Sequence, residues 1–146
     1  MLSLHKSDNM EKNSFKLLNI LLIESAFKRA SYIDFSSENV HNNIDIDIHN
    51  SITENILGVT VTLKFNTTIE DIEVISSKIK MTGNFEFSNN TNIPLEDFGN
   101  INAPAIIFPF IREHLSNVSM KAGIQPILLP PINFVNLAKK KKKQKK

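Results

Sequence analysis

Apolar and polar residues alternate regularly between positions 44 and 87 of the chain. Ile44–His49 alternates residue by residue, which predicts a strand with one solvated face. Two further runs repeat this alternation, and their apolar faces consist of Leu57, Val59, Val61, Leu63 and Phe65, and of Ile75, Ile79, Met81, Phe85 and Phe87. Asn66–Thr68 is the expected hairpin turn between these runs. Strands joined by short turns predict an antiparallel sheet.

The segment Phe15–Phe27 is apolar on both alternating faces. A strand that is covered on both sides has this composition. The spacing of its leucines also fits a helix, so periodicity alone leaves both elements open. The segment after it, Ser31–Asn43, is polar and is expected to be a long connection. Three bulky residues interrupt that connection: Tyr32, Phe35 and Val40.

The C-terminal third of the chain predicts two helices. After an expected loop at Asn89–Asn102, one apolar stripe recurs at three- and four-residue spacing through Phe108, Ile111, Leu115, Val118 and Ala122. Gly123 is placed to end this helix, and Pro109 must lie in its first turn or kink it. Ile127–Leu129 is expected to be a short extended piece. Pro130 and Pro131 break the structure, and Ile132–Ala138 is expected to form about two turns of a last helix.

Length and charge divide the chain into three parts. The 146 residues suit one domain, preceded by a polar, flexible N-terminus at residues 1–13. Seven of the 17 basic residues lie in the tail at residues 139–146. The remainder has 10 basic and 15 acidic residues, so the body carries a charge of about −5. The expected domain is therefore acidic and covers residues 14–138, and it is followed by a basic lysine tail.

The residues that carry most enzyme chemistry are absent or badly placed. The chain has no cysteine, which excludes disulfides and thiol nucleophiles and is consistent with a reducing, cytoplasmic location. Its four histidines lack the spacing of metal ligands, and its four glycines form no phosphate loop. No apolar run approaches the ~20 residues that span a bilayer, so membrane insertion is not expected. These features predict a β-rich protein without catalytic residues, metal or cofactor.

The lysine tail allows three interpretations. It can be a solvated tail, it can attach to nucleic acid or another anionic surface, or it can contact the acidic body of another copy. No aromatic residue lies among the lysines, so base stacking and specific nucleic-acid recognition are not expected there.

Two C-terminal motifs are similar to those of the SecB protein-export chaperone family. The first spans Asn102–Glu113 and resembles the family's Pro-x-Ile-Leu-Phe-Pro-Tyr-x-Arg-Glu helix start. The second spans Gln125–Phe134 and resembles its Pro-Val-Asn-Phe turn into the last helix. The residues that carry the resemblance are Pro104, Phe108, Pro109, Arg112, Glu113, Pro131, Asn133 and Phe134.

The resemblance covers about residues 14–138 and implies an α+β fold. The expected fold is a four-stranded antiparallel sheet with two helices, the last of them shortened and followed by lysines. The resemblance also implies a homotetramer built as a dimer of dimers. Members of the family hold unfolded, export-competent chains in apolar grooves, without ATP or metal, and deliver them to the SecA translocase.

The resemblance also implies two functional surfaces. The expected client groove is lined by Phe27, Tyr32, Phe35 and Val40, although Phe27 can equally be a core residue. The family docks its translocase through an acidic patch on the outer sheet face. The corresponding residues here are Glu24, Lys28, Ser76 and Lys78. Only Glu24 retains a carboxylate, and lysines at two of these positions would repel a basic partner segment.

Three functions are consistent with the sequence. The first is a holdase chaperone that keeps unfolded chains competent for export. The second is a chaperone of the same kind that serves one client, such as an antitoxin, without SecA. The third is a module that binds nucleic acid or an anionic surface through its tail.

Overall fold

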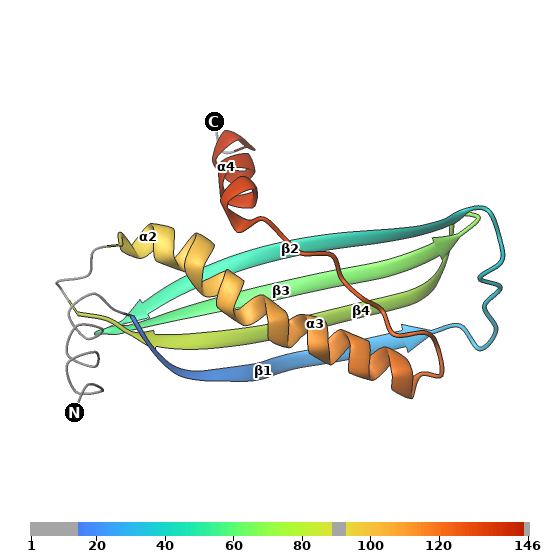
Figure 1. Cartoon of the computed structure of the whole chain (residues 1–146), viewed down its shortest axis with the longest axis horizontal. Helices are drawn as coiled ribbons and strands as arrows, with labels where there is room; N and C mark the ends of the chain where they lie inside the picture. Colours follow the sequence, from blue (N-terminus) through green and yellow to red (C-terminus); the bar gives the residue numbers. More distant parts are fainter. Residues whose placement is uncertain (1–14, 89–92, 145–146) are drawn as a thin grey trace, which may run out of the picture.

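The computed structural model describes residues 15–88 and 93–144, so the predicted flexible N-terminus lies outside the described residues. One antiparallel sheet contains all four strands of Figure 1, in the order β1-β4-β3-β2. Their bounds are Lys16–Arg29 for β1, Val40–Thr53 for β2, Ile56–Ile69 for β3 and Ile72–Glu86 for β4. The structure confirms the predicted antiparallel sheet.

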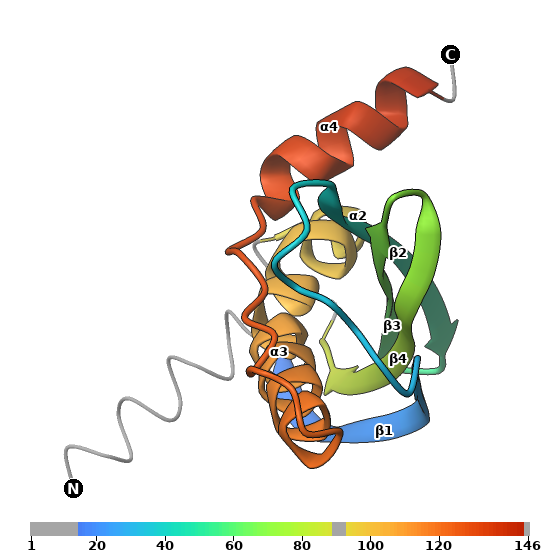
Figure 2. The same ribbon diagram turned by 90° about the vertical axis from the view of Figure 1, so that its right-hand side faces the viewer.

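Two longer helices complete the α+β fold, as the sequence predicted. Helix α3 (Ala103–Lys121) lies across one face of the sheet, and α4 (Phe134–Gln144) projects beyond β2 (Figures 1 and 2). The predicted loop at Asn89–Asn102 is wrong in its second half, because a short helix α2 (Leu95–Asp97) and a π-helical turn η1 (Phe98–Asn102) occupy it. The Phe98 ring stacks on Phe15 at 3.6 Å and meets the edge of Phe85 at 5.1 Å, so tertiary packing orders this segment.

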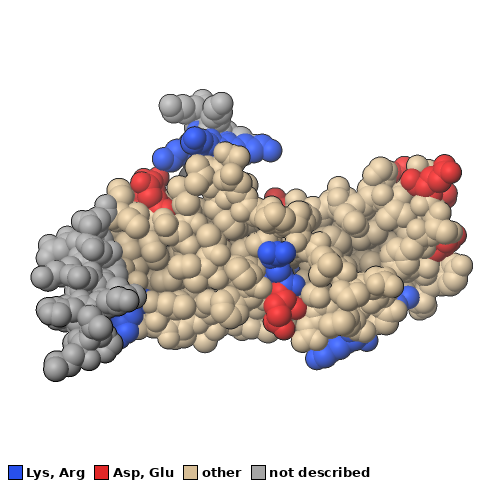
Figure 3. Space-filling model, viewed as in Figure 1, with Lys and Arg blue, Asp and Glu red and all other residues tan. Residues whose placement is uncertain are grey.

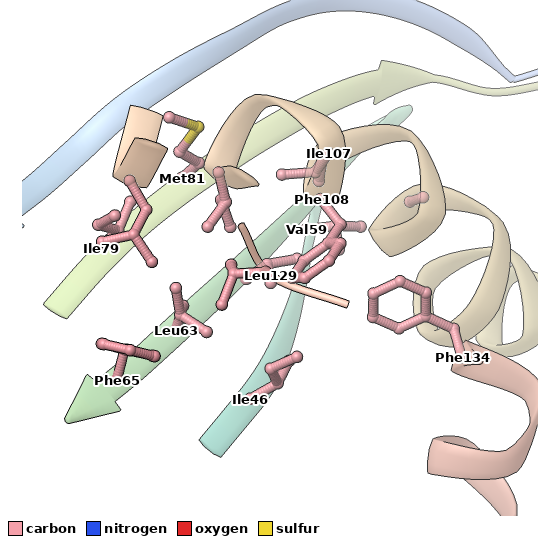
Figure 4. Close-up of a cluster of buried hydrophobic side chains, with 14 of the residues drawn as sticks. Ile46, Val59, Leu63, Phe65, Ile79, Met81, Ile107, Phe108, Leu129 and Phe134 are labelled. Carbon is pink, nitrogen blue, oxygen red and sulfur yellow. The ribbon is translucent and has the colours of Figure 1, made fainter. Parts of the chain in front are cut away.

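The core lies between the sheet and α3 (Figure 4). The alternating residues of β3 form its floor: Leu57, Val59, Val61, Leu63 and Phe65 are all at most 5% exposed. Ile107, Ile111 and Leu115 of α3 are 0% exposed and close the core from above. Each such side chain stabilises the fold by roughly 1.5–3 kcal/mol when fully buried. The helix can approach closely because β4 has a glycine, Gly83, where a Cβ atom would lie 2.9 Å from the Ile107 Cδ1 atom.

The hairpin between β3 and β4 turns later than the sequence predicted. Asn66–Thr68 lies within β3, and the turn is made by Glu70 and Asp71, whose φ angles are 51° and 67°. Two successive positive φ values fit the twist of a tight hairpin. The strand continues through Asn66–Thr68 because threonine favours strands. The Thr67 hydroxyl also donates a hydrogen bond to Asn42 Oδ1 of the neighbouring strand β2.

The segment Phe15–Phe27, which the sequence left open, lies in a strand, β1, along the edge of the sheet. The expected cover on both faces is absent within the described part of this single chain. Both faces of β1 keep large apolar side chains 43–54% exposed: Leu17, Leu18, Leu21, Leu22 and Ile23. Two register irregularities, between Leu17 and Asn19 and between Leu22 and Glu24, turn individual side chains toward different faces.

The last helix does not end before the lysines, as was predicted, but continues through them to Gln144. It begins with an ordinary cap, because the Asn136 backbone N–H donates to Asn133 Oδ1. Lysine is a good helix former, and one lysine here also has partners. Lys141 Nζ donates to Asp47 Oδ1 at 3.1 Å and to the backbone oxygen of Ile46 at 3.2 Å, which ties α4 to β2.

Candidate functional site

A hollow of about 1060 Å³ lies on the helix side of the sheet, between two irregular segments. One is the connection at residues 30–39, between β1 and β2. The other, here called the strap, is the segment 123–133 that runs from the end of α3 back toward α4 (Figure 1). We call this hollow the apolar groove; its apolar lining residues are Ile33, Phe35, Val40, Ile44, Phe65, Ile75, Ile124, Pro126, Ile127, Leu128, Leu129 and Pro130.

The strap is held in place by hydrogen bonds at the end of α3. Gly123 has a φ of 74°, a backbone conformation that favours glycine and turns the chain out of the helix. Arg29 of β1 donates to the Ala122 backbone oxygen at 2.6 Å, which joins the helix end to the sheet. The Ile127 N–H donates to the buried Ser119 hydroxyl at 2.9 Å. Leu129 then packs into the core, so the strap has a fixed course over the sheet (Figure 4).

The opposite wall of the groove, the connection at residues 30–39, has fewer anchors. The Ala30 N–H donates to the Val74 backbone oxygen at 2.8 Å, and Ile33 packs partly into the core. Hydrogen bonds from the Ser36 hydroxyl and the Ser36 backbone N–H hold the pKa of Asp34 below its ordinary value. This wall is therefore ordered mainly by local contacts, and its central side chains remain available to a ligand.

The structure brings together two of the four predicted groove residues. Phe35, which is 51% exposed, and Val40 both line the apolar groove. Phe27 does not line this groove; it packs partly against the core and borders a separate hollow of about 450 Å³. Tyr32 lines neither hollow and is 81% exposed. Ile44 and Phe65 contribute to both hollows, but the sheet separates them, because the smaller hollow is lined mainly by residues of the outer face.

Sequence reasoning missed the contribution of the strap. Ile124, Ile127 and Leu128 form much of one wall, and Leu128 is 78% exposed. The available signal was the apolar run between Gly123 and Pro130, which is too short for a helix and is bounded by residues that interrupt regular structure. Such a run predicts an extended segment but not the surface it faces.

The predicted docking residues all lie on the outer face of the sheet, the face turned away from α3. Lys28 of β1 lies opposite Ser76 of β4, and Ala26 lies opposite Lys78, two residues further along the same strands. Glu24, the one carboxylate that remained of the expected acidic patch, is 3.5 Å from Lys78 Nζ. The acidic group is thus paired within the chain, and two of the four predicted docking positions are lysines.

The residues of the two sequence motifs have mainly structural roles. Pro104 is buried in the first turn of α3, and Phe108 meets Phe134 edge to face at 5.7 Å (Figure 4). Pro109 lies beyond the first turn, on the exposed side of α3, where water can reach the carbonyl group that lacks its usual donor. These motif residues therefore determine how α3, the strap and α4 are connected. The remaining motif residues are exposed: Arg112, Glu113, Pro131 and Asn133.

Side chains that bind metal ions do not cluster in residues 15–88 and 93–144. No three His, Cys, Asp or Glu side chains in this part of the chain lie close enough together to hold a metal ion. His114 of α3 forms a hydrogen bond of 2.7 Å with the Ser25 hydroxyl of β1, which joins the helix to the edge strand. No helix in the part described is long and apolar enough to cross a membrane.

Comparison with known proteins decides the family. The chain matches the family described as "Preprotein translocase subunit SecB" over residues 9–145. The chain belongs to the SecB family. Similar proteins named "Protein-export protein SecB" include those of Azoarcus sp., at 36% identity over 58% of this chain, and Nitrosomonas europaea, at 30% over 80%. The match spans 57% and 69% of the length of these two relatives.

A solved structure confirms the SecB-like fold. The SecB-like chaperone of Mycobacterium tuberculosis, determined in complex with a ChAD peptide from an antitoxin, superposes with a TM-score of 0.69. The superposition covers 81% of this chain and 90% of that one, at 10% sequence identity. SecB proteins are chaperones and not enzymes, so family membership confirms the sequence-based prediction that the chain is not an enzyme.

Proposed function

We propose that this protein is a holdase chaperone that binds unfolded polypeptides in the apolar groove. The observation that supports this most strongly is the groove itself: about 1060 Å³ of space walled mainly by aliphatic and aromatic side chains. Phe35 and Leu128 lie on opposite walls and remain half or more exposed, which is costly for a chain without a ligand. Binding of this kind needs neither nucleotide nor metal.

The lining of the groove suits clients of varied sequence. Apolar contact has no directional requirement, so a wall of isoleucine, leucine and proline side chains accepts many apolar segments. Arg29 and Gln125 line the same groove and can donate to the backbone oxygens of an extended chain. We therefore propose that clients bind as extended segments with apolar side chains directed into the groove.

Delivery to the export machinery is the first candidate use of this binding. The family description and the names of the relatives support it, and it would place the protein in the cytoplasm with SecA as its partner. The second candidate, a chaperone for one client, is favoured by the lysines on the outer sheet face. A measurement of SecA binding separates the two, because only the exporting chaperone requires it.

We also propose that the chain associates with itself into a dimer of dimers. Strand β1 and helix α3 both expose large apolar side chains, which are 39–49% exposed: Leu17, Leu18, Leu22, Ile106 and Phe110. The Ser25–His114 hydrogen bond holds the two elements side by side. A second copy that covers these side chains would provide the cover that the composition of β1 predicted.

The function is tested by the suppression of aggregation of an unfolding model protein, measured by light scattering without nucleotide. The intact chain should suppress aggregation at severalfold excess. The double variant Phe35→Asp/Leu128→Asp should weaken suppression by about tenfold or more, because it places two charges in an apolar groove.

The matched control is Ile52→Asp/Ile72→Asp, which changes two residues that are 56% and 67% exposed and line neither hollow. This control should hold clients as well as the intact chain does. Equal loss in both variants, or no suppression by the intact chain, would exclude the groove as the client site.

A further inference from the structure

The outer face of the sheet has a cluster of lysines that the apolar groove does not use. Lys64 of β3 lies directly opposite Lys78 of β4, and Lys80 lies one step further along β4, opposite Thr62. Like charges directly opposite one another on a sheet are destabilising. On their other neighbouring strands these lysines face carboxylates, Asp45 opposite Lys64 and Glu24 opposite Lys80, which offset part of this repulsion.

These lysines surround a hollow of about 370 Å³ with a largely polar lining. Lys141 of α4 borders the same hollow, together with Asp45 and Asp47 of β2. Lys78 is paired with Glu24, and Lys141 is paired with Asp47. Among the described residues, no carboxylate lies within 4.0 Å of the ammonium group of Lys64 or of Lys80. These two ammonium groups make no close ion pair with the described residues, so they can reorient toward a ligand, although Asp45 and Glu24 lie opposite them in the sheet.

We propose that this basic hollow is a docking site for an extended, acidic segment of a partner protein. Side chains two residues apart on a strand lie about 6.8 Å apart on the same face. Lys78 and Lys80 have this spacing, and so do alternate carboxylates on an extended acidic peptide. The cross-strand neighbour Lys64 widens the positive surface by about 5 Å, so that a chain lying between β3 and β4 has lysines on both sides.

The surroundings of the hollow favour a polypeptide over a nucleic acid. No aromatic side chain lines it, so bases have nothing to stack on. Asp45 and Asp47 lie along its β2 side and would repel a continuous phosphate backbone, whereas a peptide can place uncharged side chains beside them. The neighbouring hollow that contains Phe27 shares Lys64, Lys78 and Asp45 with this one, and it offers apolar surface to the rest of a peptide.

This proposal does not depend on client holding, so the two can fail separately. The test measures fluorescence anisotropy of a labelled ten-residue peptide of alternating Glu and Ser, with an alternating Gln and Ser peptide as the neutral probe. The intact chain should bind the acidic peptide, and added salt should weaken the binding. The variant Lys64→Glu/Lys80→Glu should bind it at least about tenfold more weakly.

The matched control is Lys16→Glu/Lys121→Glu, which changes the net charge equally at two exposed lysines that line none of these hollows. It should weaken binding by less than about threefold, because screened charges far from the ligand contribute little. Both variants should keep the unfolding temperature and the client holding of the intact chain. If the Glu pair fails to fold, Lys64→Gln/Lys80→Gln replaces it and should still lose binding.

Three results would overturn the proposal. The intact chain could fail to prefer the acidic peptide over the neutral one. The two double variants could lose binding equally, which would assign it to the overall charge or to the tail. Finally, an oligothymidylate of similar length could bind more tightly than the peptide and be released by the Lys64 and Lys80 changes, which would make the face a nucleic-acid surface.

Discussion

Ser119 is a polar residue buried completely on the core side of α3, where apolar residues are the rule. Its hydroxyl donates to the Ser116 backbone oxygen at 2.7 Å and accepts from the Ile127 N–H at 2.9 Å. A buried N–H without an acceptor loses its bond to water and gains nothing in return. One hydroxyl therefore fixes the strap, and with it one wall of the apolar groove, against the end of the helix.

Replacing this hydroxyl should affect both stability and binding. Ser119→Ala leaves the Ile127 N–H unsatisfied, so the free energy of unfolding should fall by about 1–3 kcal/mol. Client holding should weaken under conditions in which the variant remains folded, because the strap loses its anchor. Urea denaturation and light scattering measure the two effects. Ser116→Ala, in the same helix, removes a hydroxyl that makes no hydrogen bond to the described residues and should change little; an equal loss there would contradict this role.

At the scale of single residues, the sequence predicted the groove only in part. Phe35 and Val40 stood out because they are apolar in a polar segment. Tyr32 stood out for the same reason, yet the direction of its side chain depends on loop geometry that no periodicity encodes. Leu128 lies about ninety positions further along the chain, and its place beside Phe35 follows from how the strap crosses the sheet. A surface formed by two segments that are far apart in the sequence cannot be predicted from either segment alone.

The elements were predictable where one periodicity dominated. The alternation of β3 and β4 places residues on two faces of a sheet, and the structure confirms each face. Predictions failed where tertiary contacts or turn geometry decided the outcome. Phe98 orders a segment with little helical signal, Glu70 and Asp71 adopt a turn conformation unusual for their residue types, and Lys141 finds a partner on β2.

The composition of the edge strand β1 predicts a buried strand, but its side chains are largely exposed in the single chain. It is apolar on both faces, yet in one chain both faces are largely exposed. Among the described strands, β1 pairs only with β4, so one side of its backbone is open to hydrogen bonding there. Apolar faces and an unpaired edge together form the surface that self-association would cover.

Breaking this surface should separate the copies. Leu22→Asp/Phe110→Asp places charges on two residues that are each 49% exposed, one in β1 and one in α3. The intact chain should sediment near four times its mass of 16.5 kDa, and the variant should sediment at or below half of that assembly. Analytical ultracentrifugation gives both masses. The Ile52→Asp/Ile72→Asp variant should remain assembled, and its dissociation would refute the assignment to β1 and α3.

Across the whole molecule, the charged side chains and the exposed apolar side chains lie in different regions of the surface. The face that carries α3 is mainly uncharged in Figure 3, and lysines gather on α4 at its margin. The tail holds seven lysines, whereas the body carries about −5. These two parts should therefore respond differently to salt, since screening weakens charge attraction but not apolar burial.

Deletion of residues 139–146 tests which part performs the function. The shortened chain should suppress aggregation within about twofold of the intact chain, because the groove and the Phe108–Phe134 contact remain. Its weak, salt-sensitive attraction to oligonucleotides should disappear with the lysines. Filter binding and light scattering report the two activities. Loss of client holding with the tail would instead favour a module that acts through an anionic surface.

The two edges of the sheet differ in what they offer a neighbouring strand. At the β2 edge, Lys141 donates a hydrogen bond to the backbone oxygen of Ile46, and Asp45 and Asp47 lie on either side of Ile46. Charged side chains on an edge strand discourage pairing with a further strand. The β1 edge is bent by two register irregularities, but no other described strand pairs with its outer backbone groups. A sheet with only one edge available for strand pairing can pair with one other sheet, and the combined sheet then has no free edge at which to add a third. Such a protein can carry strongly apolar strands and still form closed pairs rather than fibrils.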